Sequence, residues 1–329
     1  MSSIKCQRTI LLVAVFYFQA YGQQPVATQP EVEQKPAAAP TVDYLQSAAQ
    51  SSIFIYEGNT QPCDLQAQGP QQPAPLGSGF VVGISDASAK PEKWSGWRFL
   101  ITARHVVKAT NGAVVLRLNQ SSEGEPAKCL PIVLKYGGEG QNVFVLRDEE
   151  GADVAAVFLT DVPGTSPTIF GASMLLDSEG MKKNEVKVGT NVFTVGYFYG
   201  YAGVKQNYPI TKFGKISILT SEKWFYNPAW QRKEEAYVMD LQNTPGLSGA
   251  PVMTYGVEFH LKPMFEYREL PPYVVGIVKG LELAPVPTQA GTFAISQGIT
   301  AVEPAYHIRM LLDLIVRQIK EGGWHPVLD

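Results

Sequence analysis

The sequence predicts an all-β fold that ends in one α-helix. Short β-like runs fill the chain on both sides of a Pro/Gly/Ser-rich break at residues 163–171, and clear helical periodicity occurs only after Pro304. About six strands on each side of the break indicate two antiparallel barrels or sandwiches. A length of 329 residues fits one two-lobed unit or two small domains, and a hydrophobic content of 45% is ordinary for a globular protein.

The expected strands share a high content of β-branched and aromatic residues, with turn residues between them. Before the break they are Ser52–Tyr56, Phe80–Ile84, Trp97–Thr102, Ala113–Leu118, Ile132–Tyr136, Val143–Arg147 and Val154–Leu159. After the break they are Asn191–Tyr197, Lys215–Leu219, Ala236–Leu241, Val252–Tyr255, Tyr273–Lys279 and Thr292–Ser296. The pattern therefore predicts β-structure in both halves of the chain.

The helix is expected after Pro304, a residue that suits the first turn of a helix. Apolar residues then recur on one face at helical spacing, and a pair of glycines at 322–323 ends the pattern. These apolar residues are Ile308, Leu311, Leu312, Ile315 and Ile319. We expect the stripe to pack against the core.

The N-terminal residues indicate export. Lys5 and Arg8 precede an apolar run at residues 10–18, and a small-x-small pattern ends at Gly22. We interpret this stretch as a secretory signal peptide that is cleaved before Gln23. An uncleaved anchor is the alternative, but the apolar run is short for a bilayer span. The mature protein is therefore expected to be periplasmic or secreted, without a membrane span.

The domain organisation follows from these patterns. A stretch rich in Gln, Pro and Ala follows the signal peptide, lacks large apolar residues and is expected to be a disordered linker. The expected parts are a signal peptide at 1–22, the linker at 23–42, an N-terminal β-unit at 43–165, a C-terminal β-unit with the helix at 166–322, and a tail at 323–329.

Export changes the interpretation of the three cysteines. Cys6 would leave with the signal peptide, so the mature chain keeps Cys63 and Cys129. Two cysteines in an oxidising compartment can pair as a disulfide. Two free thiols are the competing interpretation, because the sequence does not give their separation. Neither cysteine has a motif for redox chemistry or metal binding.

Ser248 is the candidate nucleophile, because it stands between Gly246 and Gly249 with Pro245 and Pro251 outside them. Glycines permit a tight turn that pushes the hydroxyl outward. Backbone N–H groups can converge beside such a serine and stabilise an oxyanion. The alternative is an ordinary Gly/Pro loop, so the interpretation depends on whether the chain also supplies a base.

His105 and Asp153 are the candidate partners of this serine. His105 stands at the end of an apolar strand, whereas the three other histidines have no distinctive frame. Asp153 directly precedes an apolar strand, where a partly buried carboxylate needs a hydrogen-bond donor such as an imidazole. Asp148 and Asp161 lie in more polar, turn-like surroundings and are weaker candidates.

Three motifs in the order His, Asp, Ser resemble those of the chymotrypsin-type serine peptidases, and most closely the bacterial trypsin-like and HtrA-type branch. They are Thr-Ala-x-His-Val-Val at 102–107, Asp-Val-Ala-x-x-x-Leu at 153–159 and Pro-Gly-x-Ser-Gly-x-Pro at 245–251. The likeness runs from about residue 50 to about residue 318 and includes matching flanks at 77–82, 188–197 and 273–279.

The resemblance implies two six-stranded antiparallel β-barrels with the active site in the cleft between them. It assigns Ser248 as the nucleophile, His105 as general base and then acid, and Asp153 as the residue that orients the imidazole. The backbone N–H groups of Gly246 and Ser248 would form the oxyanion hole. The implied reaction is hydrolysis of a peptide bond in a protein or peptide substrate through an acyl-enzyme, with no metal or cofactor.

A catalytically silent binding module for a protein or peptide partner is the alternative function, because an altered oxyanion turn could disable an intact triad. The net charge of −3 gives no reason to expect nucleic acid as a partner. The sequence does not indicate an oligomeric state.

The resemblance gives weaker expectations about specificity. It implies an S1 pocket built partly from Gln242 and from Val278, Lys279 and Gly280 on the strand that lines the cleft. Since none of these is acidic, cleavage after Arg or Lys is not expected. The aromatic run 193–208 and the inserts 221–235 and 256–272 could rim the cleft, although packing is the more usual role of such residues.

One departure from the digestive enzymes predicts how the site is activated. Leu247 stands where those enzymes have an acidic residue that pairs with a newly cleaved N-terminus. We therefore expect a preformed site that needs no zymogen cleavage. No segment of the size of a PDZ domain follows the expected helix, so we do not expect regulation by such domains.

Overall fold

The computed structural model describes residues 44–64, 73–85, 96–122, 124–147, 151–160, 169–198, 201–227, 231–261, 265–269, 271–288 and 291–324. The chain divides into two units, Met1–Thr41 and Val42–Asp329, and the described residues belong to the second unit. The expected signal peptide and linker lie outside the described residues, as do Asp148, Asp161 and His325. No helix in the described part of the chain is long and apolar enough to cross a membrane.

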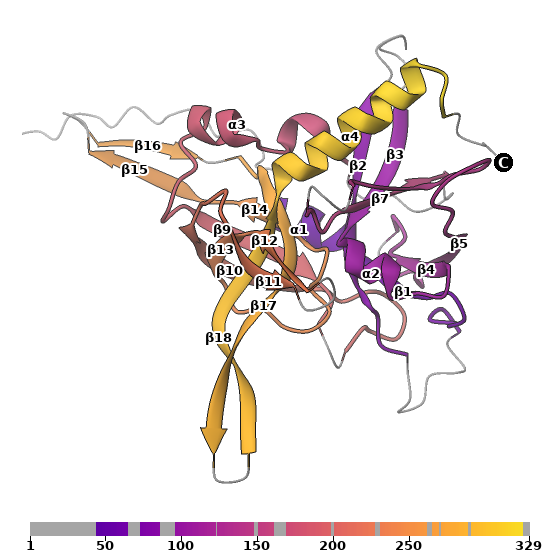
Figure 1. Cartoon of the computed structure of the whole chain (residues 1–329), viewed down its shortest axis with the longest axis horizontal. Coiled ribbons are helices and arrows are strands. Elements are labelled where there is room, and N and C mark those ends of the chain that lie inside the picture. Colours follow the sequence, from indigo (N-terminus) through magenta and orange to yellow (C-terminus); the bar gives the residue numbers. More distant parts are fainter. Residues whose placement is uncertain are drawn as a thin grey trace, which may run out of the picture. The chain divides into compact units, whose positions relative to one another are not determined.

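The N-terminal half of the second unit is an eight-stranded sheet (Figure 1). Its path runs from β5 (Lys128–Val133) through β4 (Ala113–Leu118), β1 (Ile53–Glu57), β2 (Gly77–Ser85), β3 (Gly96–Thr102) and β7 (Ala155–Leu159) to β6 (Val143–Val145). All these pairs are antiparallel, and β8 (Ile169–Gly171) adds a parallel pair on β2. The sequence placed every strand of the path, but β5 lies four residues before the expected Ile132–Tyr136 start.

This half is a half-barrel rather than the closed six-stranded barrel that the resemblance implied. The two outer strands approach each other through single hydrogen bonds instead of a ladder. The N–H of Lys135 donates to Asn142 Oδ1 at 2.8 Å, and the N–H groups of Asn142 and Val143 donate to the Lys135 carbonyl at 3.1 and 3.0 Å. Because β6 has only three residues, it offers too little backbone for a regular closing pair.

The C-terminal half is the closed six-stranded barrel that was predicted. Its strand order is β10 (Ile210–Ile218), β13 (Tyr237–Asp240), β18 (Gly291–Pro304), β17 (Val274–Thr288), β14 (Pro251–Thr254) and β9 (Asn191–Gly196). β17 and β18 extend beyond the barrel as a long two-stranded ribbon (Figure 1). The expected strand Tyr273–Lys279 ended too early, because β17 continues to Thr288 through Pro285 and Pro287, which the edges of a two-stranded ribbon can hold.

Each of the two inserts, 221–235 and 256–272, contains a β-hairpin. One consists of β11 (Lys223–Asn227) and β12 (Arg232–Glu235), and the other of β15 (Val257–Leu261) and β16 (Phe265–Glu269). The first hairpin does not alternate between polar and apolar residues, whereas β15 alternates from Val257 to Leu261, a strand signal that the sequence analysis missed.

Four helices and one 3₁₀ turn complete the described chain: α1 (Tyr44–Gln50), α2 (Arg104–Lys108), η2 (Ala172–Met174), α3 (Ser178–Lys183) and α4 (Ala305–Lys320). α4 begins directly after Pro304, as predicted, and the four apolar residues of the expected stripe up to Ile315 are buried. The all-β fold class with a C-terminal helix is therefore confirmed, with three shorter helices that the sequence pattern did not show.

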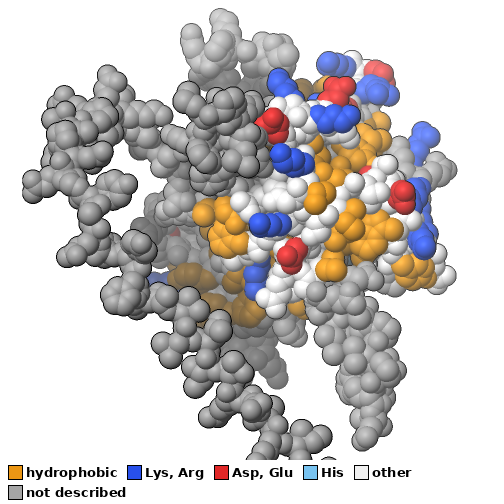
Figure 2. Space-filling model, turned by 90° about the vertical axis from the view of Figure 1, so that its left-hand side faces the viewer, with side chains coloured by type: hydrophobic (Ala, Val, Ile, Leu, Met, Phe, Trp, Pro, Cys, Tyr) orange, Lys and Arg blue, Asp and Glu red, His pale blue; other side chains and the backbone are white. Residues whose placement is uncertain are grey.

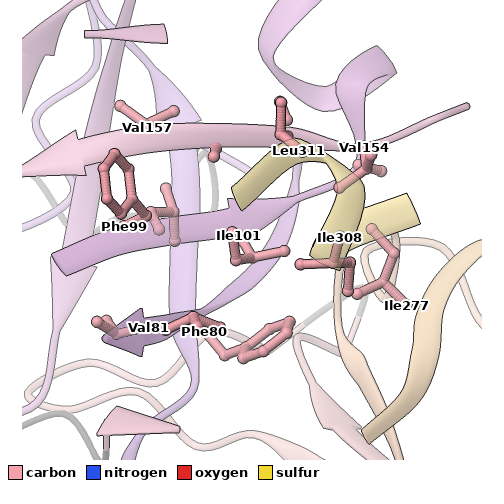
Figure 3. Packing of buried hydrophobic residues seen from close by; sticks show 14 of the residues in the cluster. Phe80, Val81, Phe99, Ile101, Val154, Val157, Ile277, Ile308 and Leu311 are labelled. Atoms are coloured by element: carbon pink, nitrogen blue, oxygen red, sulfur yellow. The ribbon is translucent and has the colours of Figure 1, made fainter. Parts of the chain in front are cut away.

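α4 joins the two halves into one hydrophobic core. Figure 3 shows Ile308 of α4 beside Ile277 of β17, with Leu311 beside Val154 at the start of β7. Trp324, in the segment expected to be a tail, is only 5% exposed and its ring centroid lies 5.0 Å from that of Phe144. The core therefore includes residues from both ends of the described chain.

The surface is mixed in character. Figure 2 shows one face of the molecule, on which exposed hydrophobic side chains lie among lysine and arginine side chains and a few carboxylates. On β10, Phe213 and Ile218 point outward and are 51% and 49% exposed. Single exposed apolar residues are normal on a protein surface, so only several of them held together indicate a binding surface.

Candidate active site

Asp153 holds His105 by two hydrogen bonds. Its Oδ1 accepts the backbone N–H of His105 at 2.9 Å, and its Oδ2 lies 2.7 Å from His105 Nδ1. The register between β3 and β7 pairs Thr102 with Ala155, which brings the residues just beyond these strand ends together. The first bond also caps α2, whose N-cap Ala103 has no side chain able to do so. One carboxylate therefore both starts the helix and orients the imidazole.

This arrangement determines the tautomer of His105. A buried carboxylate at Nδ1 favours a proton on that nitrogen, which leaves Nε2 free to accept one. The Asp153 side chain is 1% exposed, whereas that of His105 is 33% exposed. The imidazole is thus held from its buried side and open on its other side, as a general base requires.

The pKa of His105 is raised above its ordinary value of 6.5. Burial lowers this pKa, but the negative charge of Asp153 and its hydrogen bond raise it by more, with smaller opposing effects from Lys279 and Glu234. A general base works in its neutral form, so activity should appear only as the pH rises through the raised value.

We therefore expect the acidic limb of a kcat/KM profile to have its midpoint above pH 6.5. The same raised pKa makes the charged His105 contribute to stability below its unfolded pKa, and that contribution is lost as the pH rises through the folded value. NMR titration of the His105 ring would assign the limb to this residue. A midpoint at or below 6.5 would contradict the role of Asp153.

Ser248 lies in a turn that only glycines can form. Gly246 and Gly249 have φ of +98° and +84°, in the left-handed region. A Cβ on Gly249 would lie 2.2 Å from Thr102 Oγ1, and one on Gly246 would lie 2.2 Å from Tyr197 Cδ1. The conformation and the close packing both explain why these two positions are glycine.

The turn is fixed to both halves of the fold. The N–H of Ser78 on β2 donates to the Ser248 carbonyl at 2.8 Å, and the N–H of Gly249 donates to the Val278 carbonyl on β17 at 2.8 Å. Leu247 is fully buried in the core of the closed barrel. An apolar anchor thus stands where the digestive enzymes use an ion pair, although the expected independence from zymogen cleavage remains a prediction.

The expected oxyanion donors are free. Among the described residues, no hydrogen bond uses the N–H of Gly246 or that of Ser248. The Gly246 carbonyl accepts from Ser78 Oγ at 2.8 Å, and Ser78 Oγ accepts the Tyr197 N–H at 2.8 Å. These bonds fix the backbone on one side of the turn. Sequence reasoning placed Ser78 in a family-like strand but missed this role.

The segment that carries His105 and the turn that carries Ser248 both pack closely against Gly77. A Cβ on Gly77 would lie 2.7 Å from Cγ2 of Val106, the neighbour of His105, and 2.8 Å from the Ser248 carbonyl oxygen. Within the described chain, however, no hydrogen bond joins the Ser248 hydroxyl to the imidazole. Such bonds are often long before substrate binds. The structure thus packs the described segments that carry His105 and Ser248 against the same glycine, with no hydrogen bond between the two side chains.

The residues expected in the S1 pocket occupy different surroundings. Gln242 is exposed, Val278 is fully buried and Gly280 is half-buried. The Lys279 ammonium is buried, 2.8 Å from Glu234 Oε2 and 2.6 Å from Glu303 Oε2. Its charge is therefore already paired and is not available to a substrate.

Sequence reasoning missed this buried charge cluster, because its members are scattered along the chain. Glu234 lies on β12, Lys279 on β17 and Glu303 on β18, and His307 of α4 contacts Glu303. Arg232 Nε lies 3.1 Å from Glu234 Oε1 at the cluster's outer side. Among the described residues, no three His, Cys, Asp or Glu side chains are placed to hold a metal ion.

The two remaining cysteines form a disulfide in the structure. Cys63 and Cys129 have Cα atoms 5.9 Å apart and join a segment after β1 to strand β5. The sequence left two free thiols as the alternative.

A half-barrel and a closed barrel, with a His–Asp pair whose segment packs near a glycine-framed serine turn, fit a chymotrypsin-like fold. The sequence matches the trypsin-like peptidase domain family over residues 77–258, which is more than half of the chain. The protein therefore belongs to the trypsin-like peptidase family and is a serine protease. The matched residues contain all three candidate catalytic positions.

Solved structures similar to this chain include other proteases. The active form of the Rv3671c protease from M. tuberculosis is 18% identical, with 90% of this chain and 93% of that chain covered and a TM-score of 0.44. The HtrA-type protease AlgW with a decapeptide is 16% identical, with 83% and 68% covered and a TM-score of 0.43. Deg5 is 17% identical, with 83% and 88% covered and a TM-score of 0.37. No curated protein sequence matches this chain.

Proposed function

We propose that the protein is an exported serine endopeptidase with a Ser248–His105–Asp153 triad. The observation that carries this proposal is the His105–Asp153 pair, which holds Nδ1 and leaves Nε2 free beside the Ser248 turn. Ser248 would attack the scissile carbonyl while His105 takes its proton. The C–N bond would then break as His105 gives that proton to the leaving amine, and water would hydrolyse the acyl-enzyme with His105 again as the base.

The unused N–H groups of Gly246 and Ser248 would bind the oxyanion of each tetrahedral intermediate. Donors already fixed in place stabilise developing charge without reorganisation, and one such donor typically contributes about 10²–10³ in kcat. The bonds from Ser78 to the turn support this role, because they hold the backbone before substrate arrives.

A silent binding module is the second candidate, favoured by the absence of a Ser248–His105 hydrogen bond within the described chain. A fluorophosphonate probe distinguishes the two, because it reacts only with an activated serine. We expect the folded protein to form one covalent adduct, located by peptide mapping at Ser248, and Ser248→Ala to form none. Folded wild-type protein that stays unlabelled would favour the binding module.

Export is supported by the signal-like residues up to Gly22 and by the Cys63–Cys129 disulfide, a bond typical of oxidising compartments. We propose a periplasmic or secreted location. Sequencing of the mature N-terminus should find Gln23 as the first residue, and a mature protein that still begins at Met1 would contradict cleavage.

A further inference from the structure

Four exposed apolar residues lie within one short segment after β9, and we name them the aromatic platform. They are Phe198, Tyr201, Val204 and Tyr208, with exposed fractions of 40%, 55%, 48% and 51%. The Tyr201 and Tyr208 rings stack with centroids 6.1 Å apart. Four such residues within eleven positions form a group, whereas most exposed apolar residues stand alone.

Arg117 of β4 holds the backbone of the platform segment in place. Arg117 is 1% exposed, and its guanidinium donates to the carbonyls of Ala202, Gly203 and Val204 at 3.3, 2.9 and 2.7 Å. A buried guanidinium is costly unless its donors are used, so these bonds fix the segment that they reach.

Further bonds anchor the same segment along its length. Asn207 is buried, its N–H donates to Asn119 Oδ1 at 2.7 Å, and its Nδ2 donates to the Arg117 carbonyl at 2.7 Å. The N–H of Ala127 donates to the Lys205 carbonyl at 2.6 Å. A ligand would therefore meet a backbone that is already fixed, and binding would cost little freedom in ordering this segment.

The platform is continuous with the candidate oxyanion turn. Tyr197, the residue before Phe198, packs against Gly246 so closely that a Cβ there would lie 2.2 Å from the ring. Its N–H also reaches that turn through Ser78 Oγ. Strand β17, in contrast, forms backbone hydrogen bonds with Gly249 and Ala250. The platform thus begins at the Gly246 end of the turn, and β17 lies at the other end.

We propose that the aromatic platform is a subsite for an aromatic or long aliphatic side chain of an extended polypeptide substrate, beyond the residues bound at Ser248. This rests on the proposed peptidase function. None of the four platform residues is charged, so the side chain that they accept is apolar. Offset or edge contacts between aromatic rings add to the burial of apolar surface.

The test compares an extended substrate with a small probe in the double variant Tyr201→Ala/Tyr208→Ala. Both rings are more than half exposed, so the variant should fold normally. Cleavage sites are first mapped in denatured casein, and decapeptides around one site are then made with Phe, Leu or Ala at each flanking position. We expect the variant to lose about tenfold in kcat/KM for Phe- or Leu-bearing peptides.

Two controls separate the platform from the catalytic centre. The rate of fluorophosphonate labelling should not change in the double variant, because that probe does not reach the platform. The double variant Phe213→Ala/Ile218→Ala removes two apolar side chains of similar exposure on β10 and should leave the peptide preference intact.

The outcomes are distinct. Loss of the Phe and Leu preference at one flanking position, with labelling unchanged, supports the subsite. An equal loss for peptides flanked by Ala, or no loss at all, overturns it while leaving the peptidase function standing. A change in sedimentation of the variant with unchanged cleavage would show that the platform binds a second copy and would also overturn the subsite. A wild-type protein that neither labels nor cleaves would remove both proposals.

Discussion

Replacing Asp153 with asparagine should lower the rate of acylation about 10⁴-fold, the usual loss when this position in a triad becomes an amide. The carboxylate accepts two hydrogen bonds, one from the backbone N–H of His105 and one at Nδ1. An amide has one oxygen and one NH₂ group. If the oxygen keeps the backbone bond, the NH₂ group faces Nδ1 and moves the imidazole proton to Nε2, where the base must be free.

The measurement is the second-order rate of fluorophosphonate labelling of Asp153→Asn above the pKa of His105, together with kcat on a mapped peptide. Asp177→Asn is the matched control. Asp177 caps α3 through Gly180 at 2.7 Å and pairs with Arg309 at 2.6 Å, and an amide can keep the cap. We expect this control to react at the wild-type rate. A loss of less than tenfold in Asp153→Asn would show that another group orients His105.

Replacing Lys279 with methionine should destabilise the protein by about 3–5 kcal/mol, because it leaves two buried carboxylates without their shared cation. Glu234 and Glu303 are fully buried, and the Lys279 side chain is 1% exposed. Burial lowers the pKa of Lys279, but the two carboxylates raise it by more, so the lysine is charged at neutral pH. The melting temperature should fall by roughly 10 °C.

Thermal and urea unfolding would measure this loss. Lys215→Met removes an exposed lysine from β10 and should change the free energy of unfolding by less than about 0.5 kcal/mol. The triple variant Lys279→Met/Glu234→Gln/Glu303→Gln should recover part of the stability, since it also removes the two buried negative charges that shared the lysine. Unchanged melting of Lys279→Met would mean that water reaches the two carboxylates.

The sequence was sufficient to predict those features of the candidate site that depend on residues close together in the chain or on two adjacent strands. The motif frames at His105 and Asp153 identified a pair that the structure joins at 2.7 Å, because β3 and β7 are adjacent and antiparallel. The glycines around Ser248 predicted a tight turn, and both have positive φ. In each case, the physical requirement is visible within a few residues of the site.

The features that the sequence did not predict depend on long-range contacts. Arg117 was given no role from the sequence, yet it is buried beneath a segment 85–87 residues further along. Lys279 was expected at the substrate pocket, but three distant elements supply its partners. The half-barrel also follows from a strand of three residues, a length that the apolar pattern at 143–147 overstated.

The packing of α4 has a consequence for the order of biosynthesis. Ile308 and Leu311 complete an interior whose other residues, such as Val154 and Ile277, come from both lobes, and Trp324 packs against Phe144. A nascent chain that lacks its last thirty or so residues therefore has an open core, although every residue of the candidate triad has already been synthesised. Since domains fold as units during synthesis, we expect proteolytic competence to arise only after α4 has been made, so a chain without this helix cannot digest its surroundings.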